Sequence, residues 1–192
     1  MNTFAITGMG RSGTKFLAFM LNKSKVWKVN HEIDKTLEFD ISKINLRFQK
    51  ENYGEVSSFL RYILDEIEVE KKCVIIRDPR EVFVSAFNRK GYYISEQLWK
   101  DFSKTYKKLE GYIDQGIKAF RFEKMTSDPE YLTSIAKYVG IDDITFNEKN
   151  CATVIHANPN EIKKINKWDE LPLEARKRGM GVFGWFVKKY YK

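Results

Sequence analysis

The chain has 192 residues, of which 43% are hydrophobic and 15% aromatic, a composition that suits one folded domain and excludes a disordered segment. Lys and Arg number 34 against 26 Asp and Glu, which gives a formal net charge of +8. No stretch has the roughly 18 apolar residues that a membrane span needs, and no signal peptide precedes the first predicted strand. We therefore expect a cytoplasmic protein without a membrane span.

The positive charge has two interpretations, which are nucleic-acid binding and a basic surface for a polyanionic small molecule with an acidic acceptor. The lysines are scattered along the chain, and no helix-turn-helix, zinc-finger or RNP signature is present. We therefore do not expect nucleic acid as a partner. Cys73 opens a predicted buried strand, which favours a reduced thiol, and the two histidines, His31 and His156, lie far apart in sequence. We expect no metal site.

The first twenty residues hold the most informative pattern. The apolar run from Phe4 to Ile6 predicts a strand over residues 2–7, glycines follow at positions 8, 10 and 13, and apolar residues at helical spacing predict a helix over 13–23. Glycines let backbone N–H groups approach an anion, and the helix N-terminus adds the positive end of its dipole. Strand, turn and helix together predict a site for a nucleotide or a phosphate ester.

Two common phosphate-binding signatures fit this turn incompletely. The nucleoside triphosphatase P-loop needs Lys and a hydroxyl residue directly after its second glycine, whereas here Lys15 comes one place late and Phe16 follows it. The dinucleotide signature G-x-G-x-x-G matches literally, and Glu32 or Asp34 would supply the acidic residue that it needs about twenty positions on. On the turn alone, both kinds of site stay open.

Strands alternate with helices along the rest of the chain, which predicts an α/β fold with a mainly parallel sheet between two layers of helices. The further predicted strands are 26–29, 73–77 and 117–123. The further predicted helices are 56–67, 79–89, 95–114, 129–139, 159–167 and 172–178, with irregular segments at 33–52 and 142–160 and a glycine-punctuated tail at 179–185. We expect one three-layer domain over 1–192, made of a cofactor-binding core at about 2–141 and a C-terminal cap at about 142–192.

A second phosphate site is predicted where the third strand meets its helix. The buried strand at 73–77 delivers Arg77 at its carboxyl end, the edge at which open α/β sheets contact ligands. Asp78 and Pro79 begin a helix, and Ser85 follows two turns later on the side that faces the strand end. An arginine and a helix hydroxyl form a clamp suited to a second phosphate.

These segments resemble the sulfotransferases that use 3′-phosphoadenosine 5′-phosphosulfate (PAPS). The first family motif is matched by Arg11-Ser12-Gly13-Thr14-Lys15-Phe16-Leu17, and the second by Arg77-Asp78-Pro79-Arg80-Glu81-Val82-Phe83-Val84-Ser85. A third segment, Phe120-Arg121-Phe122-Glu123-Lys124-Met125, resembles a strand that the family carries before an Asp-Pro helix start. The resemblance covers about residues 2–141, with a weaker similarity near the C-terminus, and implies the sulfotransferase type of P-loop fold.

The resemblance also implies a reaction, which is metal-free transfer of a sulfuryl group from PAPS to a hydroxyl or amine of an unidentified acceptor. The cofactor-binding residues that it implies are Gly10, Arg11, Ser12, Gly13, Thr14, Lys15, Phe16, Arg77, Ser85, Arg178 and Gly179. Arg11 is expected to stabilise charge at the 5′-phosphate and bridging oxygen, while Arg77 and Ser85 bind the 3′-phosphate. Phe16 suits adenine stacking and a helix core equally. Residues 176–179 suit either a loop that closes the 3′-phosphate site or a basic helix end.

The general base is expected at the end of the second strand, where His31 and Glu32 lie. Side chains alternate along a strand, so only one of the two should face the cleft, and we favour Glu32 over His31, with Asp34 third. The simpler interpretation is that these residues cap a loop. Two other functions stay open, a P-loop nucleotide kinase and a non-catalytic nucleotide-binding protein of the same fold.

Overall fold

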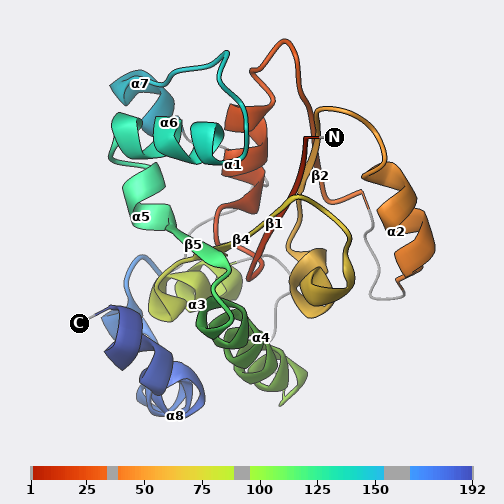
Figure 1. The fold of residues 1–192 in the computed structure, drawn as a ribbon. Coiled ribbons are helices and arrows are strands. Elements are labelled where there is room, and N and C mark those ends of the chain that lie inside the picture. Colours follow the sequence, from red (N-terminus) through yellow and green to blue (C-terminus); the bar gives the residue numbers. More distant parts are fainter. Residues whose placement is uncertain (1, 34–38, 89–95, 154–164, 192) are drawn as a thin grey trace.

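The computed structural model describes residues 2–33, 39–88, 96–153 and 165–191. Five parallel strands form one sheet in the order β2–β3–β1–β4–β5 (Figure 1). The strands are β1 (Thr3–Gly8), β2 (Lys28–His31), β3 (Tyr53–Val56), β4 (Lys71–Ile76) and β5 (Lys118–Arg121). The helices are α1 (Thr14–Leu21), α2 (Ile41–Arg47), α3 (Pro79–Phe87), α4 (Glu96–Asp114), α5 (Phe122–Met125), α6 (Pro129–Tyr138), α7 (Glu148–Cys151) and α8 (Leu173–Tyr190).

Helices cover both faces of the sheet and make three layers. Along β4, Cys73 and Ile75 face one core with α1 and α6, while Val74 and Ile76 face the other core with α3, α4 and α8. Every strand is parallel to its neighbours, as its βα connections require. This arrangement confirms the predicted three-layer α/β fold (Figure 1).

The predicted helix at 56–67 is wrong, because this part of the chain contains the last residue of a strand and two short 3₁₀ turns. Strand β3 lies between β2 and β1, and the turns are η1 (Phe59–Tyr62) and η2 (Leu64–Glu66). The strand was missed because it carries Glu55, which is fully buried. Arg47 of α2 neutralises this carboxylate across 3.1 Å. Helix α2, which Asp40 caps through the backbone N–H of Lys43, was predicted to be irregular.

The glycine-punctuated C-terminal tail is also a correction, since residues 173–190 form one continuous helix. A side chain at Gly179 would lie 2.6 Å from the ring of Trp168, so the glycine permits a close approach rather than a turn. Phe183 and Phe186 of α8 are fully buried in the core that α3 and α4 share. The C-terminal residues therefore form part of the core layer on this face.

Smaller differences concern strand ends and short helices. Strand β2 begins at Lys28, two residues later than predicted, and β5 ends at Arg121 because α5 starts at Phe122. Helix α7 lies inside the segment predicted to be irregular. Most of the helix predicted at 159–167 lies outside the described residues, and 165–167 are not helical. The helices predicted at 13–23, 79–89, 95–114 and 129–139 are confirmed with small shifts of their ends.

Candidate active site

The glycine-rich turn joins β1 to α1 in a conformation that few residue types adopt. Gly13 is the N-terminal cap of α1 with φ of 97°, and Arg11 within the turn has φ of 74°. The backbone N–H of Ser12 donates to the Met9 carbonyl oxygen at 2.9 Å and closes the turn. No side chain caps α1, and its first turn contains no acidic residue. The first backbone N–H groups of the helix are therefore suited to bind an anion.

The two sequence motifs meet in space. Arg11 Nε donates to Ser85 Oγ on α3 at 2.9 Å, and Arg77 Nη1 donates to the Arg11 carbonyl oxygen at 2.8 Å. Desolvation lowers the pKa of the largely buried Arg77 guanidinium, and Glu81 and Glu123 oppose this shift. Arginine stays charged despite such a shift, so Arg11 and Arg77 place two cations at one edge of the sheet.

Phe122 supports this edge and was not among the predicted site residues. The Arg77 guanidinium carbon lies 4.4 Å from the centre of the Phe122 ring. The same ring fills the space beside Gly13 and meets Phe16 edge-on, with 6.4 Å between the ring centres. Phe122 lies directly after β5 and belongs to the third family-like segment, Phe120–Met125. This segment was the sequence signal for it.

The remaining turn residues have different environments. Ser12 is buried and, in the part of the chain that the structure describes, its hydroxyl has no hydrogen-bond partner. A side chain at Gly10 would meet nothing within 4 Å, so the turn is open at this point. Thr14 is buried, whereas Lys15 is exposed. Phe16 is buried in the core beside α6, which favours the core interpretation of this residue over adenine stacking.

His31 and Glu32 lie close to each other at the end of β2, where strand alternation alone would turn them to opposite faces. Strand β2 ends at His31, and Glu32 has φ of 49°, which breaks the alternation of a strand. His31 Nε2 therefore lies 3.7 Å from Glu32 Oε1 and 3.4 Å from Thr14 Oγ1. Burial lowers the pKa of His31 below its usual 6.5, while Glu32 raises it and Lys15 lowers it. The imidazole is thus neutral at neutral pH.

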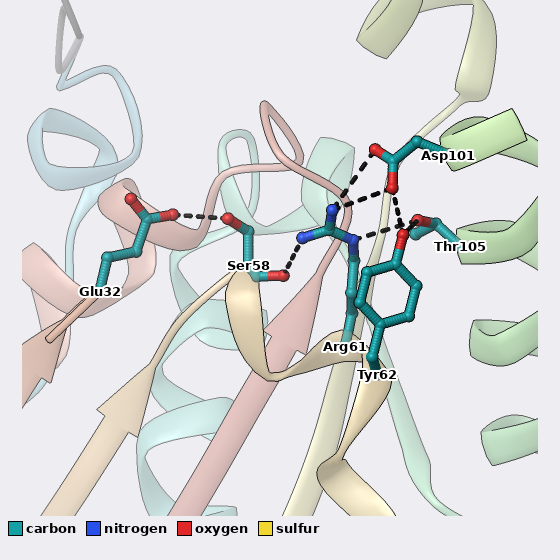
Figure 2. A network of polar contacts seen from close by, with 6 residues as sticks. All are labelled: Glu32, Ser58, Arg61, Tyr62, Asp101 and Thr105. Carbon is teal, nitrogen blue, oxygen red and sulfur yellow. Dashed lines mark hydrogen bonds and ion pairs between the residues drawn. The ribbon is translucent and has the colours of Figure 1, made fainter. Parts of the chain in front are cut away.

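Glu32 also contacts a residue that the sequence did not reveal. Ser58 Oγ donates to Glu32 Oε1 at 2.6 Å (Figure 2). Ser58 follows β3, the strand that sequence analysis missed, so no sequence signal identified it. Asp34, the third candidate base, lies outside the described residues.

Arg178 and Gly179 lie within α8 and not in a loop. Arg178 Nη2 is 2.5 Å from Glu96 Oε1 of α4, and its guanidinium carbon lies 5.2 Å from the centre of the Trp99 ring. Gly179 packs against Trp168 and Phe183. The contacts described for Arg178 and Gly179 are therefore with the layer that α3, α4 and α8 form on one face of the sheet.

The described parts of the chain contain neither a metal-binding cluster nor a membrane-spanning helix. There, no group of three or more His, Cys, Asp or Glu side chains is arranged to hold a metal ion. None of the described helices is long and apolar enough to cross a membrane.

No protein-family model and no curated protein sequence matches this chain. Solved structures that are similar to it include two sulfotransferases. A sulfotransferase from Alicyclobacillus acidocaldarius is 15% identical with a TM-score of 0.50, over 80% of this chain and 86% of the other. Mouse sulfotransferase SULT7A1 complexed with PAP is 14% identical with a TM-score of 0.58, over 98% of this chain and 89% of the other. The chain therefore has the fold of the sulfotransferases, as its motifs predicted.

Proposed function

We propose that this protein is a sulfotransferase that moves a sulfuryl group from PAPS to a hydroxyl or amine of an acceptor. The observation that carries the proposal is the hydrogen bond between Arg11 and Ser85, because it unites the two phosphate-binding motifs in one site. The similarity of fold to SULT7A1, which is complexed with PAP, supports a nucleotide of this type. PAPS, when bound, supplies the sulfuryl group on a phosphosulfate anhydride.

The turn residues fit the 5′-phosphosulfate end of such a nucleotide. The Ser12 hydroxyl is a buried donor without a partner among the described residues, and the first N–H groups of α1 carry no side-chain cap. We assign the Arg11 guanidinium to the developing charge on the leaving phosphate oxygen, where it stabilises charge without giving up a proton. Gly10, Gly13, Thr14 and Lys15 complete this binding set.

Arg77 and Ser85 fit the 3′-phosphate. Arg77 is fixed by the Arg11 carbonyl oxygen and by the face of Phe122, so it loses little side-chain freedom on binding. Ser85 Oγ accepts from Arg11, and its own hydrogen is free to point to a phosphate oxygen. A guanidinium with a hydroxyl binds a phosphate dianion through charge-assisted hydrogen bonds.

Glu32 is the proposed base, with His31 as its alternative. In the described part of the chain, Glu32 Oε2 makes no hydrogen bond, whereas Oε1 accepts from Ser58. We therefore assign Oε2 to the proton of an acceptor hydroxyl or amine. The neutral His31 presents a ring nitrogen that is also able to accept a proton.

Calorimetric titrations separate this function from its rivals. We expect 3′,5′-adenosine bisphosphate (PAP) to bind, and ATP with magnesium to bind far more weakly. Tighter binding of ATP would favour a nucleotide kinase and contradict the proposal. PAP binding without transfer of ³⁵S from labelled PAPS to any member of a phenol, sugar, amine and peptide panel would favour a non-catalytic nucleotide-binding protein.

A further inference from the structure

The Glu32 carboxylate is held from the neighbouring strand. Strands β2 and β3 are parallel with His31 opposite Val56, so the residues that follow them leave the sheet at the same edge. Ser58 lies two residues beyond β3, is 6% exposed, and donates its hydroxyl to Glu32 Oε1 at 2.6 Å (Figure 2). A buried hydroxyl has few alternative positions, so this hydrogen bond fixes one of the two carboxylate oxygens of Glu32.

The backbone of Glu32 has an unfavourable conformation. Its φ of 49° lies in the left-handed region, which costs about 1–2 kcal/mol for a residue with a side chain. Such conformations persist where surrounding contacts determine them, and they concentrate at functional sites. The hydrogen bond from Ser58 is such a contact.

Ser58 is itself held by a buried arginine. Arg61 of η1 is 8% exposed, and its Nη1 donates to the Ser58 carbonyl oxygen at 2.6 Å. Its Nε donates to Thr105 Oγ1 at 3.1 Å, and its Nη2 to Asp101 Oδ1 at 3.1 Å, both on α4 (Figure 2). Each guanidinium nitrogen therefore has a partner, and the arginine connects the turn after β3 to α4.

Stability alone does not account for this arrangement. A buried ion pair is often no more stabilising than an apolar replacement of the same shape, because both charges lose their hydration. Arg61 and Asp101 instead fix a geometry, which the Tyr62 hydroxyl completes through its contacts with Asp101 and Thr105. The element fixed by this geometry is the turn that carries Ser58.

We propose that Arg61 is a positioning residue for Glu32 and acts through Ser58. Arg61 holds the Ser58 carbonyl group to α4, and Ser58 then presents its hydroxyl to Oε1 and leaves Oε2 to the acceptor. This inference rests on the proposed function, in which Glu32 is the base. It assigns a role in placing the base to Arg61 of η1, whose hydrogen bonds are with Ser58, Thr105 and Asp101.

A double-mutant cycle tests whether Arg61 acts on Glu32 through Ser58. We expect Ser58→Ala and Arg61→Gln each to lower kcat by about 10- to 100-fold, the cost of misplacing a reacting group, with unchanged affinity for PAP. The double variant should be no slower than the slower single variant, since both act on one contact. Tyr62→Phe is the matched control, because its hydroxyl belongs to the network but contacts neither Ser58 nor Arg61 Nη1. Additive losses, or a Tyr62→Phe loss as large as that of Arg61→Gln, would overturn the proposal.

A second measurement does not depend on activity. The carboxyl ¹³C resonance of Glu32, identified by its disappearance in Glu32→Gln, should shift in the same direction in Ser58→Ala and in Arg61→Gln. A resonance that moves in Ser58→Ala but keeps its wild-type position in Arg61→Gln would show that Arg61 does not position Glu32 through Ser58. If Arg61→Gln does not fold, Thr105→Val removes the Nε acceptor with little change of shape and takes its place. Failure of the wild type to bind PAP would reject the proposed function, while this resonance would still decide the positioning role.

Discussion

The ring of Phe122 occupies the space where a side chain of Gly13 would stand. A Cβ atom at Gly13 would lie 2.2 Å from the nearest ring carbon, and the residue has φ of 97°. Phe122, the first residue of α5, and the helix-capping Gly13 thus fit together only while position 13 has no side chain. This contact links the third family-like segment to the phosphate turn.

Gly13→Ala should therefore destabilise the protein by at least about 2 kcal/mol. The left-handed backbone contributes about 1–2 kcal/mol and the overlap with Phe122 about 1–3 kcal/mol. Urea unfolding measures the change. Gly10→Ala is the control, because nothing lies within 4 Å of its added carbon, and its free energy of unfolding should stay near the wild-type value. Equal losses for the two variants would contradict this geometry.

Arg77→Ala should weaken PAP far more than adenosine 5′-phosphosulfate, which lacks the 3′-phosphate. Loss of a charge-assisted pair costs about 1.5–3 kcal/mol, which corresponds to about one to two decades in Kd. Calorimetry with both nucleotides measures the difference. The same loss for both would remove the assignment of Arg77 to the 3′-phosphate.

The pKa of His31 should be below 6.5, because burial favours the neutral imidazole. Between the folded pKa and 6.5 the unfolded chain binds more protons, so stability from this group rises with pH in that window. It is complete above 6.5 and is lost as pH falls through the folded pKa. Titration of the ring resonances by NMR measures the value, and His31→Gln identifies the signal. Lys15→Met should raise the pKa and Glu32→Gln should lower it further; a value above 6.5 would contradict this account.

Arg47→Met should destabilise the fold by about 3–5 kcal/mol, because it removes the guanidinium that lies 3.1 Å from the fully buried Glu55 carboxylate. Thermal and urea unfolding measure this loss. Glu174→Gln, which removes one partner of the exposed ion pair with Lys177, should leave stability unchanged. A similar small effect of Arg47→Met would show that the Glu55 pair is not needed to hold β3 in the sheet.

The sequence revealed those parts of the fold in which local pattern and tertiary role agree. The phosphate turn, Asp78 with Pro79 at the start of α3, and the apolar stripe of α4 each carry their own signal. Strand β3 was hidden because Glu55 is buried through a partner on α2 that no local pattern reveals. The first turns of α8 were predicted as a helix at 172–178, but its continuation was hidden because Gly179 marks close packing on Trp168, while glycine usually marks a turn.

The candidate site divides in the same way. Arg11, Arg77 and Ser85 were predicted from motifs, and the structure brings them together. Ser58 depends on the missed strand β3. The contact between His31 and Glu32 depends on the left-handed backbone conformation of Glu32. A sequence signals such a conformation when the residue is glycine, and position 32 is a glutamate.

Transfer of ³⁵S from labelled PAPS tests the central claim most directly, measured for the wild type and for Arg11→Ala, Glu32→Gln and His31→Gln. We expect the wild type to label an acceptor and Arg11→Ala to lose transfer while staying folded. Glu32→Gln should lower kcat by about 10²–10⁴-fold with nearly unchanged PAP affinity, and His31→Gln should lower it less. Loss of transfer in His31→Gln but not in Glu32→Gln would make histidine the base. Normal transfer by all three variants would contradict the site.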